Sequence, residues 1–358
     1  MATPAVLQFR KSFLAPILSL IAVVLAAEII DHSFNAYIQL IFLYICINII
    51  LALSLNLVNG FTGQFSIGHA GFMAVGAYTS AFLSTHPSLF GYEIRFLPAS
   101  LDFFNYPIYA LAGGLTAAAA GYVVGLPSLR LKGDYLAIVT LGFGEIIRVI
   151  LLNTEAVGGA RGLFGISSPA DITIAGIEIS AFAQSFFWAA TAMVLTFIFL
   201  WRLINSSHGR GFLSVREDEI AAEAMGINTT NIKVLAFVLS SFFAGIAGSV
   251  FAHSTHYLNP STFSFQKSVD VIIMVVLGGM GSLTGSIVAA IIVSVLPELI
   301  LRPLQDYTHV DLRMVIYSLL LIIFMIMRPQ GIFGTTEISF ANLMKSFFHG
   351  RKDVIKNS

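Results

Sequence analysis

Ionisable side chains inside otherwise apolar stretches are the groups in this sequence that could do chemistry. Glu145 and Arg148 stand in the segment GFGEIIRVI, where a helix would place them on one face. His69 directly follows the segment GFTGQFSIG. A charge at the centre of a bilayer costs about 2.5–3.5 kcal/mol on insertion scales, so each such residue needs a reason. For Glu145 and Arg148 a structural ion pair is the first interpretation and contact with a zwitterionic ligand the second. His69 either contacts a ligand or donates a hydrogen bond at a helix break.

Composition identifies the solvent that surrounds most of the chain. Of 358 residues, 57% are hydrophobic and 11% are charged, against about 25% charged residues in soluble domains. The chain is therefore expected to be a polytopic membrane protein in a lipid bilayer. Lys plus Arg equals Asp plus Glu at 19 each, so nothing indicates a nucleic-acid partner. The lone cysteine, Cys46, excludes an internal disulfide and a cysteine-based metal site, and no metal site is expected.

Apolar stretches of about 17–25 residues predict an all-α fold of about ten transmembrane segments. The predicted spans are 13–30, 36–58, 65–84, 108–126, 134–152, 185–204, 232–252, 265–280, 283–301 and 312–328. The stretch 265–280 is the least regular and could be a partial or re-entrant helix. A cytoplasmic N-terminus places most of the 19 Lys and Arg residues in cytoplasmic segments, as the positive-inside rule requires. We therefore expect a cytoplasmic segment 1–12, a transmembrane domain 13–328 and a cytoplasmic tail 329–358.

Glycine-rich segments interrupt two of these spans. Gly63 and Gly68 lie in the first, and Gly278 and Gly279 lie in the second, LGGMGSLTG. The first interpretation is close helix packing, because small residues recur at helical spacing in two sets, Ala70, Ala74, Ala77 and Ala81, then Ser240, Ala244, Gly248 and Ala252. The second is that the glycines break helices at membrane depth and line a substrate path. The similarity of the two segments indicates an internal repeat or merely a shared composition.

The connection 205–231 carries a predicted cytoplasmic helix. Ser214 and Glu217 have the spacing of a capping box, which predicts a helix from Val215 to Met225. Gly226 can adopt the left-handed conformation that ends it. The helix would present an apolar surface with nothing nearby in sequence to cover it, formed by Ile220, Ala221, Ala222, Ala224, Met225 and Ile227. The surface is either solvated or covered by a partner protein.

Several motifs in this order resemble the LivM-type permeases of branched-chain amino acid ABC transporters. They are GHAGFMAVGAY, RLKGDYLAIVTLGFGEIIRVILLN, REDEIAAEAMGIN and MVVLGGMGSLTG. The third resembles the E-A-A-x-x-x-G motif of ABC importer permeases: Gly226 matches the glycine, and Ala221 and Ala222 match the two alanines. Ile220 stands at the Glu position with Glu219 one residue earlier, and the usual Leu-Pro ending is absent. The resemblance implies an ATPase-coupling loop at Glu219, Ile220, Ala221, Ala222, Glu223 and Gly226.

The resemblance also implies the partners and the location. The chain would act with a second related permease, two cytoplasmic ATPase subunits and a periplasmic amino-acid-binding protein, in the bacterial inner membrane. It would form the translocation path for branched-chain amino acids, with a path near Gly63, Gly68, His69, Glu145, Arg148, Gly278 and Gly279. No G-x-x-x-x-G-K-[ST] phosphate loop occurs in the sequence. We therefore expect no cofactor on this chain and no enzyme activity of its own, with ATP used by the partner subunits.

Three other functional classes assign different roles to these residues: an amide permease, an ion-coupled transporter and an intramembrane enzyme. Related permeases for urea or other amides share the glycine-rich segments, so the substrate rests on resemblance. An ion-coupled secondary transporter would use Glu145, Asp270 or His69 as a proton relay and would need no ATPase. An intramembrane enzyme is disfavoured, because the sequence has no H-E-x-x-H motif, nucleophile elbow or paired intramembrane aspartates.

Overall fold

The computed structural model describes residues 23–85, 88–89, 92–93, 105–128, 134–166, 172–174 and 177–301, together with 318–319, 322–323, 326–328 and 330–334. The predicted N-terminal segment 1–12, the first part of the span 13–30, most of the span 312–328 and most of the tail 329–358 lie outside these residues. Residues 23–33 are helical, as predicted for the end of the first span.

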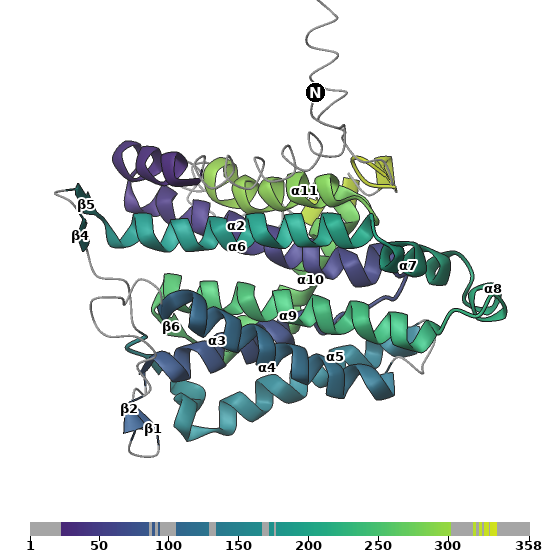
Figure 1. The fold of residues 1–358 in the computed structure, drawn as a ribbon. Helices are drawn as coiled ribbons and strands as arrows, with labels where there is room; N and C mark the ends of the chain where they lie inside the picture. Colours follow the sequence, from purple (N-terminus) through teal and green to yellow (C-terminus); the bar gives the residue numbers. More distant parts are fainter. Residues whose placement is uncertain are drawn as a thin grey trace, which may run out of the picture.

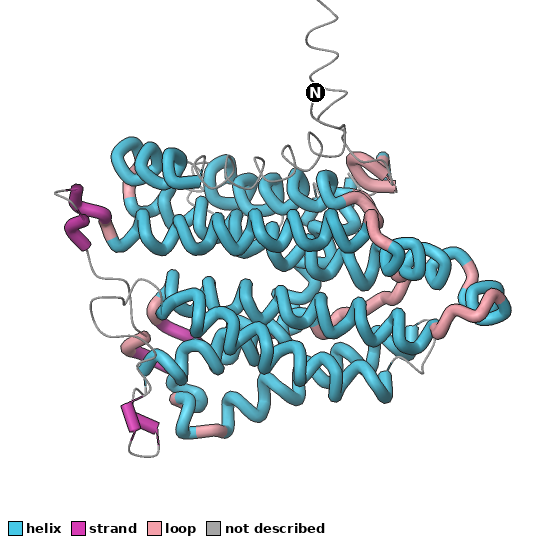
Figure 2. The backbone as a smooth tube through the Cα atoms, viewed as in Figure 1, coloured by secondary structure: helices cyan, strands magenta, loops and turns pink. Residues whose placement is uncertain are grey.

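Long helices dominate the described chain, which confirms the prediction of an all-α polytopic membrane protein (Figure 2). The long helices are α2 (Ala36–Asn56), α3 (His69–Thr85), α4 (Asn105–Ser128), α5 (Asp134–Asn153), α6 (Ala181–Ile204) and α9 (Thr229–Thr255). Among the described residues, five helices are long and apolar enough to cross a membrane: α2 with its continuation to Phe61, α4, α5, α6 and α9.

The remaining helices are shorter. Two of them, α7 (Ser207–Glu217) and α8 (Glu219–Ala224), join α6 to α9. The helix α10 (Phe265–Gly278) has 14 residues, or about 21 Å, less than the roughly 30 Å of a hydrocarbon core. This length agrees with a partial span at the predicted stretch 265–280. The helix α11 (Leu283–Val295) continues into the π turn η6 (Leu296–Leu301).

Short strands and 3-10 turns connect the helices at one end of the bundle. Antiparallel pairs form between β1 (Ser88–Leu89) and β2 (Tyr92–Glu93), between β3 (Leu163–Phe164) and β6 (Tyr257–Leu258), and between β4 (Ile172–Ile174) and β5 (Ile177–Ile179). The turns are η3 (Glu155–Val157), η4 (Gly159–Arg161) and η5 (Pro260–Phe263). Figure 1 shows the labelled strands β1, β2, β4, β5 and β6 at the end of the bundle opposite α7 and α8.

The helices form two packed layers (Figure 1). One layer contains α2, α6 and α11, the other contains α3, α4, α5 and α9, and α10 lies between them. The centre is α2, which packs against α6, α9, α10 and α11. In the most apolar stretch of each helix, 67% of α2 and its continuation is buried, compared with 17% of α5 and 22% of α6. The apolar surfaces of α5 and α6 therefore face lipid or a neighbouring subunit.

Small residues allow α3, α4 and α9 to approach closely. A Cβ atom on Gly76 would lie 2.3 Å from the backbone of Gly245, and one on Gly248 would lie 2.0 Å from the carbonyl oxygen of Met73. Ala77 of α3 and Ala244 of α9 are fully buried. The predicted role of the small-residue stripes in helix packing is confirmed. Of the glycines at these closest contacts, Gly248 belongs to a predicted stripe, whereas Gly76 and Gly245 lie outside the stripes.

Both predicted glycine-rich breaks are present. After α2 the chain forms a π turn η1 (Leu57–Phe61) and a non-helical segment 62–68, and the second break lies between α10 and α11. Gly63, with φ +68°, and Gly279, with φ +112°, adopt backbone conformations that disfavour other residues. The first break follows α2, whose 21 residues extend over about 31 Å, close to the thickness of a hydrocarbon core. A position of this break at membrane depth stays a prediction.

Candidate coupling and translocation site

The helix in the connection 205–231 does not begin at Ser214, as the capping box predicted. It begins as α7 at Ser207, and the Ser214 hydroxyl donates back to the Arg210 carbonyl at 2.8 Å. The chain then bends at Asp218, whose carboxylate accepts hydrogen bonds from the backbone of Ile220 at 2.9 Å and of Ala221 at 3.0 Å. Asp218 is therefore the N-cap of α8. Two helices form because a serine within a helix bonds backward along it, while an aspartate satisfies the free amides of a helix start.

The predicted end of this helical segment at Gly226 is confirmed. Gly226 has φ +84°. Its amide donates to the Glu223 carbonyl at 2.9 Å, and the amide of Ile227 donates to the Ala222 carbonyl at 3.0 Å. These two bonds form a Schellman motif, which satisfies carbonyls that the helix end leaves open.

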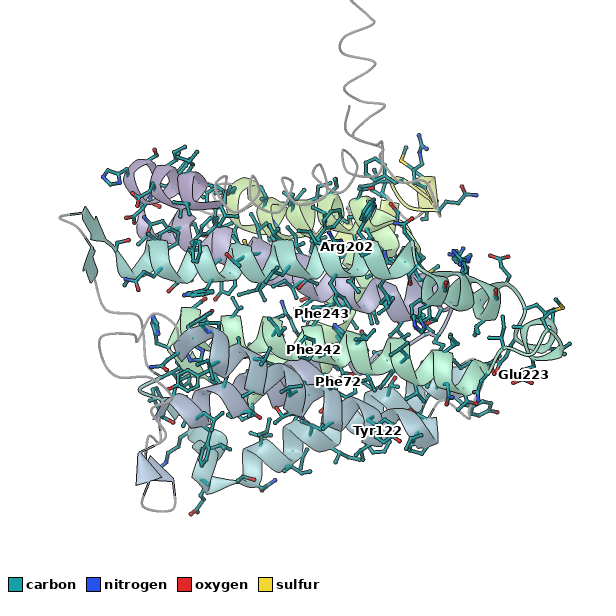
Figure 3. The ribbon with its side chains drawn as sticks, in the orientation of Figure 1. Phe72, Tyr122, Arg202, Glu223, Phe242 and Phe243 are labelled. Atoms are coloured by element: carbon teal, nitrogen blue, oxygen red, sulfur yellow. The ribbon has the colours of Figure 1, made fainter. Side chains whose placement is uncertain are left out.

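One face of α8 is attached to the chain itself. Glu219 forms an ion pair with Lys233 of α9, and Glu223 accepts a hydrogen bond from the Thr229 hydroxyl at 2.6 Å. Ala222 is only 4% exposed. Figure 3 labels Glu223 at this end of the molecule. The expectation that Ala222 meets a partner directly is therefore wrong, because its own chain covers it.

The opposite face of α8 is apolar and open. Ile220 is 73% exposed and Met225 is 83% exposed, and Ala221 and Ala224 between them are also exposed. These four residues, which we call the outer face of α8, form a more limited apolar surface than the sequence predicted.

Within the connection 205–231, the helix α7 contacts the first glycine-rich break. Phe212 and Val215 are buried and hold α7 on the bundle, where it packs against α6, α9 and η1. The Arg216 guanidinium donates from Nη1 to the Gly60 carbonyl at 3.0 Å. The side chain also passes Gly63, where an added Cβ atom would lie 3.2 Å from Arg216 Cγ.

The second break meets the first at the same place. A Cβ atom on Gly60 would lie 2.4 Å from the Gly281 nitrogen, and one on Gly281 would lie 2.7 Å from Arg216 Nη1. Asn56, at the end of α2, accepts from the Gly281 amide at 2.9 Å and donates to the Ser282 carbonyl at 2.9 Å and to the Ser286 hydroxyl at 2.8 Å. We call this contact of α7 with the two breaks, formed by Asn56, Gly60, Arg216 and Gly281, the break junction.

Other predicted glycines act through close packing. A Cβ atom on Gly68 would lie 2.3 Å from the Thr140 carbonyl oxygen of α5, and one on Gly278 would lie 2.5 Å from the backbone of Gly285. Each glycine therefore permits a close approach of neighbouring backbones. A place for them on a translocation path stays a prediction.

His69 lies at the start of α3 and is 2% exposed. Its Nε2 atom lies 2.9 Å from the Ser54 hydroxyl oxygen of α2. The Ser54 hydroxyl also donates to the Leu51 carbonyl at 3.0 Å. With its one proton used there, Ser54 accepts from His69, and the ring joins α3 to α2. This contact favours the structural role of the histidine.

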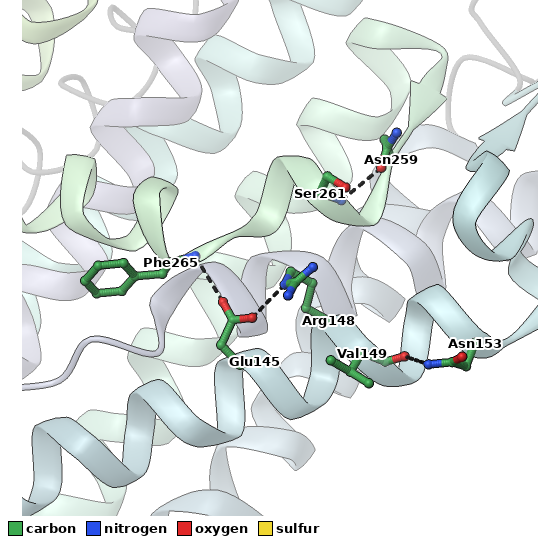
Figure 4. A network of polar contacts seen from close by, with 7 residues as sticks. All are labelled: Glu145, Arg148, Val149, Asn153, Asn259, Ser261 and Phe265. Atoms are coloured by element: carbon green, nitrogen blue, oxygen red, sulfur yellow. Dashed lines mark hydrogen bonds and ion pairs between the residues drawn. The ribbon is translucent and has the colours of Figure 1, made fainter. Parts of the chain in front are cut away.

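The predicted ion pair of α5 is confirmed. Arg148 Nε lies 2.7 Å from Glu145 Oε2, and the other carboxylate oxygen accepts from the Phe265 amide at 3.1 Å. Figure 4 shows Glu145 between Arg148 and the backbone of Phe265. Because Phe265 is the first residue of α10, the carboxylate fixes the start of that short helix against α5. Direct contact of the pair with substrate stays a prediction.

Sequence reasoning missed the residues that join distant elements. The sequence predicted no specific contact for Arg216 or for Lys233. The sequence does indicate a polar contact for Asn56, because this residue lies in the apolar run LALSLNLV and polar groups inside a membrane span need partners. Across the part of the chain that the structure describes, no group of three or more His, Cys, Asp or Glu side chains could hold a metal ion.

Comparisons with known proteins identify the family of the chain. The family described as "Branched-chain amino acid transport system / permease component" matches residues 37–325. The chain is 40% identical over 315 residues to the high-affinity branched-chain amino acid transport system permease protein LivM of Escherichia coli, with 81% of this chain and 68% of the relative covered. It is 26% identical to a probable LivM permease of Methanocaldococcus jannaschii, covering 82% of this chain and 92% of that protein.

The second permease type of the same transport system is also similar. The LivH permease of Salmonella typhimurium is 24% identical over 300 residues, with 81% of this chain and 92% of the relative covered. No solved structure matches the chain. The family match over most of the chain and the 40% identity to a LivM protein show that this multi-pass membrane protein belongs to the permease component family of branched-chain amino acid transport systems.

Proposed function

We propose that this chain is a translocation subunit of an ATP-driven importer of branched-chain amino acids. The names of its relatives support the substrate class. The observation that carries the mechanism is the break junction, where Arg216 of α7 contacts both glycine-rich breaks. A movement imposed on the loop 205–231 would reach the transmembrane helices through this contact.

The proposed complex contains a second related permease, two ATPase subunits and an amino-acid-binding protein. The similarity to both LivM and LivH supports the second permease. The ATPase subunits supply the nucleotide site that this sequence lacks. The chain binds no cofactor of its own, and ATP is used by its partners.

The outer face of α8 is the proposed contact with an ATPase subunit. A short helix with exposed Ile220 and Met225 fits into an apolar groove. Glu219, Ala222 and Glu223 act from the other side, because their contacts hold α8 on α9. When the ATPase subunits close, the force passes from α8 to α7 and from Arg216 to the two breaks.

We further propose about ten spans in the bacterial inner membrane, with both termini in the cytoplasm. The distribution of Lys and Arg supports this orientation. It places α7 and α8 in the cytoplasm and the strand-bearing end of the bundle at the periplasm (Figure 1).

The structure gives less support to the two alternative functions, a proton-coupled transporter and a permease for urea or other amides. A proton relay would need Glu145, Asp270 or His69, yet Glu145 is paired with Arg148 and bonded to α10, and His69 is buried against Ser54. Of the three, Asp270 of α10 is the residue left to that alternative. The urea or amide alternative uses the same architecture and differs only in its cargo.

Reconstitution of the complete complex tests the proposal. Proteoliposomes would contain both permeases and the ATPase subunits, with loaded binding protein on the side opposite the ATPases. Uptake of labelled leucine, isoleucine and valine should require ATP and survive proton uncouplers. Uptake driven by a proton gradient without ATP, or uptake of urea in place of the three amino acids, would contradict it.

A further inference from the structure

A cavity of about 320 Å³ lies where α2, α9, α10 and α11 meet. This volume is near the lower end of the roughly 300–1,000 Å³ typical of ligand sites, as suits a molecule the size of a single amino acid. The residues that line it include two side chains of opposite charge, Lys267 and Glu298. Neither residue belongs to the break junction or to the outer face of α8.

Lys267 presents the positive charge to the cavity. Its ammonium group donates to Asn48 Oδ1 at 3.0 Å, and Asn48 donates in turn to the Ser294 hydroxyl at 2.8 Å. Among the described residues, no carboxylate lies within salt-bridge distance of Lys267. A lysine has three donors, so this ammonium retains donors for a carboxylate that enters the cavity.

Glu298 presents the negative charge from the π turn η6. It accepts a hydrogen bond from the Tyr37 hydroxyl. Its side chain lines the cavity, where a carboxylate attracts the ammonium group of a ligand.

Much of the remaining wall is aliphatic and aromatic and includes Ile41, Ile47, Met73, Phe251 and Val293. The transfer of an apolar side chain from water to such a wall is favourable. A free amino acid with an aliphatic side chain carries all three complementary features. Urea is neutral, so it can form hydrogen bonds but no ion pair with either side chain, and it has no aliphatic side chain for the apolar wall.

The cavity lies partway through the bundle. Asn48 is about midway along α2 (Ala36–Asn56), and Lys267 lies in the first turn of α10 (Phe265–Gly278). The short helix α10 therefore begins near the depth of Asn48 instead of at the end of the bundle. Transporters often place substrate sites at the midplane, beside the ends of such discontinuous helices.

We infer that this cavity is a transient substrate site, in which Lys267 and Asn48 bind the carboxylate of a branched-chain amino acid and Glu298 binds its ammonium group. The inference rests on the proposed function and adds to it the residues that contact the cargo. The apolar wall receives the aliphatic side chain, so the cavity selects both the zwitterion and the side chain.

Photocrosslinking tests the site without help from the binding protein. The complex of both permeases and ATPase subunits, in lipid nanodiscs, is irradiated with a diazirine analogue of leucine, and the adducts are mapped by peptide mass spectrometry. We expect adducts on Met73, Phe251 or Val293. Leucine should suppress them, whereas 4-methylpentanoate, which lacks the ammonium group, and leucinamide, which lacks the carboxylate, should not.

Substitutions at the two charges give the second measurement. Lys267→Gln and Glu298→Gln should each lower the labelling at least about tenfold, the effect of losing one charge-assisted hydrogen bond. The matched control is Glu155→Gln, an exposed carboxylate outside the cavity, which should not change the labelling. If one cavity variant fails to assemble, the wild-type adduct map and the labelling of the other variant determine whether the cavity binds substrate.

The outcomes separate this site from the proposed function. Adducts that map outside the cavity, or that leucine does not suppress, would reject the site. If the same preparation with binding protein still imports leucine with ATP, the proposed function stands and only the cavity is rejected. If it imports no branched-chain amino acid with ATP, the proposed function itself fails.

Discussion

Arg216 donates a hydrogen bond of 3.0 Å to the carbonyl oxygen of Gly60, a residue 156 positions earlier in the chain. The same guanidinium lies against Gly281 in the second glycine-rich break. A helix outside the bundle is thereby joined to both interrupted segments by one side chain. Movement of α7 must carry the two breaks with it or break this contact.

Asn56 should be essential for the stability of the break junction. Asn56→Ala removes three hydrogen bonds and leaves the Gly281 amide without its buried acceptor. Each buried polar group left unsatisfied costs about 1–3 kcal/mol. We expect a lower thermal unfolding midpoint, measured by fluorescence-detected size-exclusion chromatography. Asn153→Ala, which removes a bond to the Val149 carbonyl within α5, is the control, and an equal midpoint shift in both variants would contradict the prediction.

Glu145 and Arg148 should behave as one structural unit. Glu145→Gln leaves the Arg148 charge uncompensated and weakens the bond to the start of α10. The variant should therefore yield less assembled complex, and Glu145→Gln with Arg148→Gln should recover part of the loss. A double-mutant cycle on assembled complex, with uptake per complex measured alongside, separates assembly from transport. Normal assembly with abolished uptake in the single variant would move Glu145 to the substrate path.

The two faces of α8 should respond differently to a new charge. Ile220→Asp and Met225→Asp alter exposed side chains, so the chain should fold normally but retain fewer ATPase subunits on purification. Ala222→Asp places a charge at a position that is 4% exposed, so it should lower the amount of folded chain itself. Full ATPase retention in both outer-face variants would contradict the assignment of that surface.

Thiol labelling in intact cells should establish the orientation. In a Cys46→Ala background, an impermeant reagent should label a cysteine introduced at Ala160 and miss one introduced at Ser207. Both positions are exposed, at opposite ends of the bundle. Permeabilised cells provide the control, since both cysteines should then react. The reverse pattern in intact cells would contradict the proposed topology.

The long helices were predictable because their signal is local. The apolar lengths of α2, α4, α5, α6 and α9 and the i, i+3 spacing of Glu145 and Arg148 require no knowledge of neighbouring elements. The left-handed end at Gly226 was predictable for the same reason.

The errors arose where two local solutions competed or where a contact was distant. Ser214 and Asp218 both offer a capping oxygen. The helix α7 begins earlier, at Ser207, and buries Phe212 and Val215 on the bundle, a contact that the local sequence pattern does not encode. The contact of Arg216 with Gly60, and that of Lys267 with Asn48, depend on how helices far apart in sequence pack together. No spacing along the chain could indicate either contact.

The central claim is that Arg216 transmits movement of the coupling loop to the transmembrane helices. Its most direct test is the amount of leucine imported per ATP hydrolysed in proteoliposomes that contain the complete complex, compared between wild type and Arg216→Gln. Because Arg216 lies apart from the outer face of α8, the variant should retain its ATPase subunits and hydrolyse ATP. Its import per ATP should fall at least about tenfold, as expected for the loss of a charge-assisted hydrogen bond. An unchanged ratio in a fully assembled Arg216→Gln complex would contradict the account.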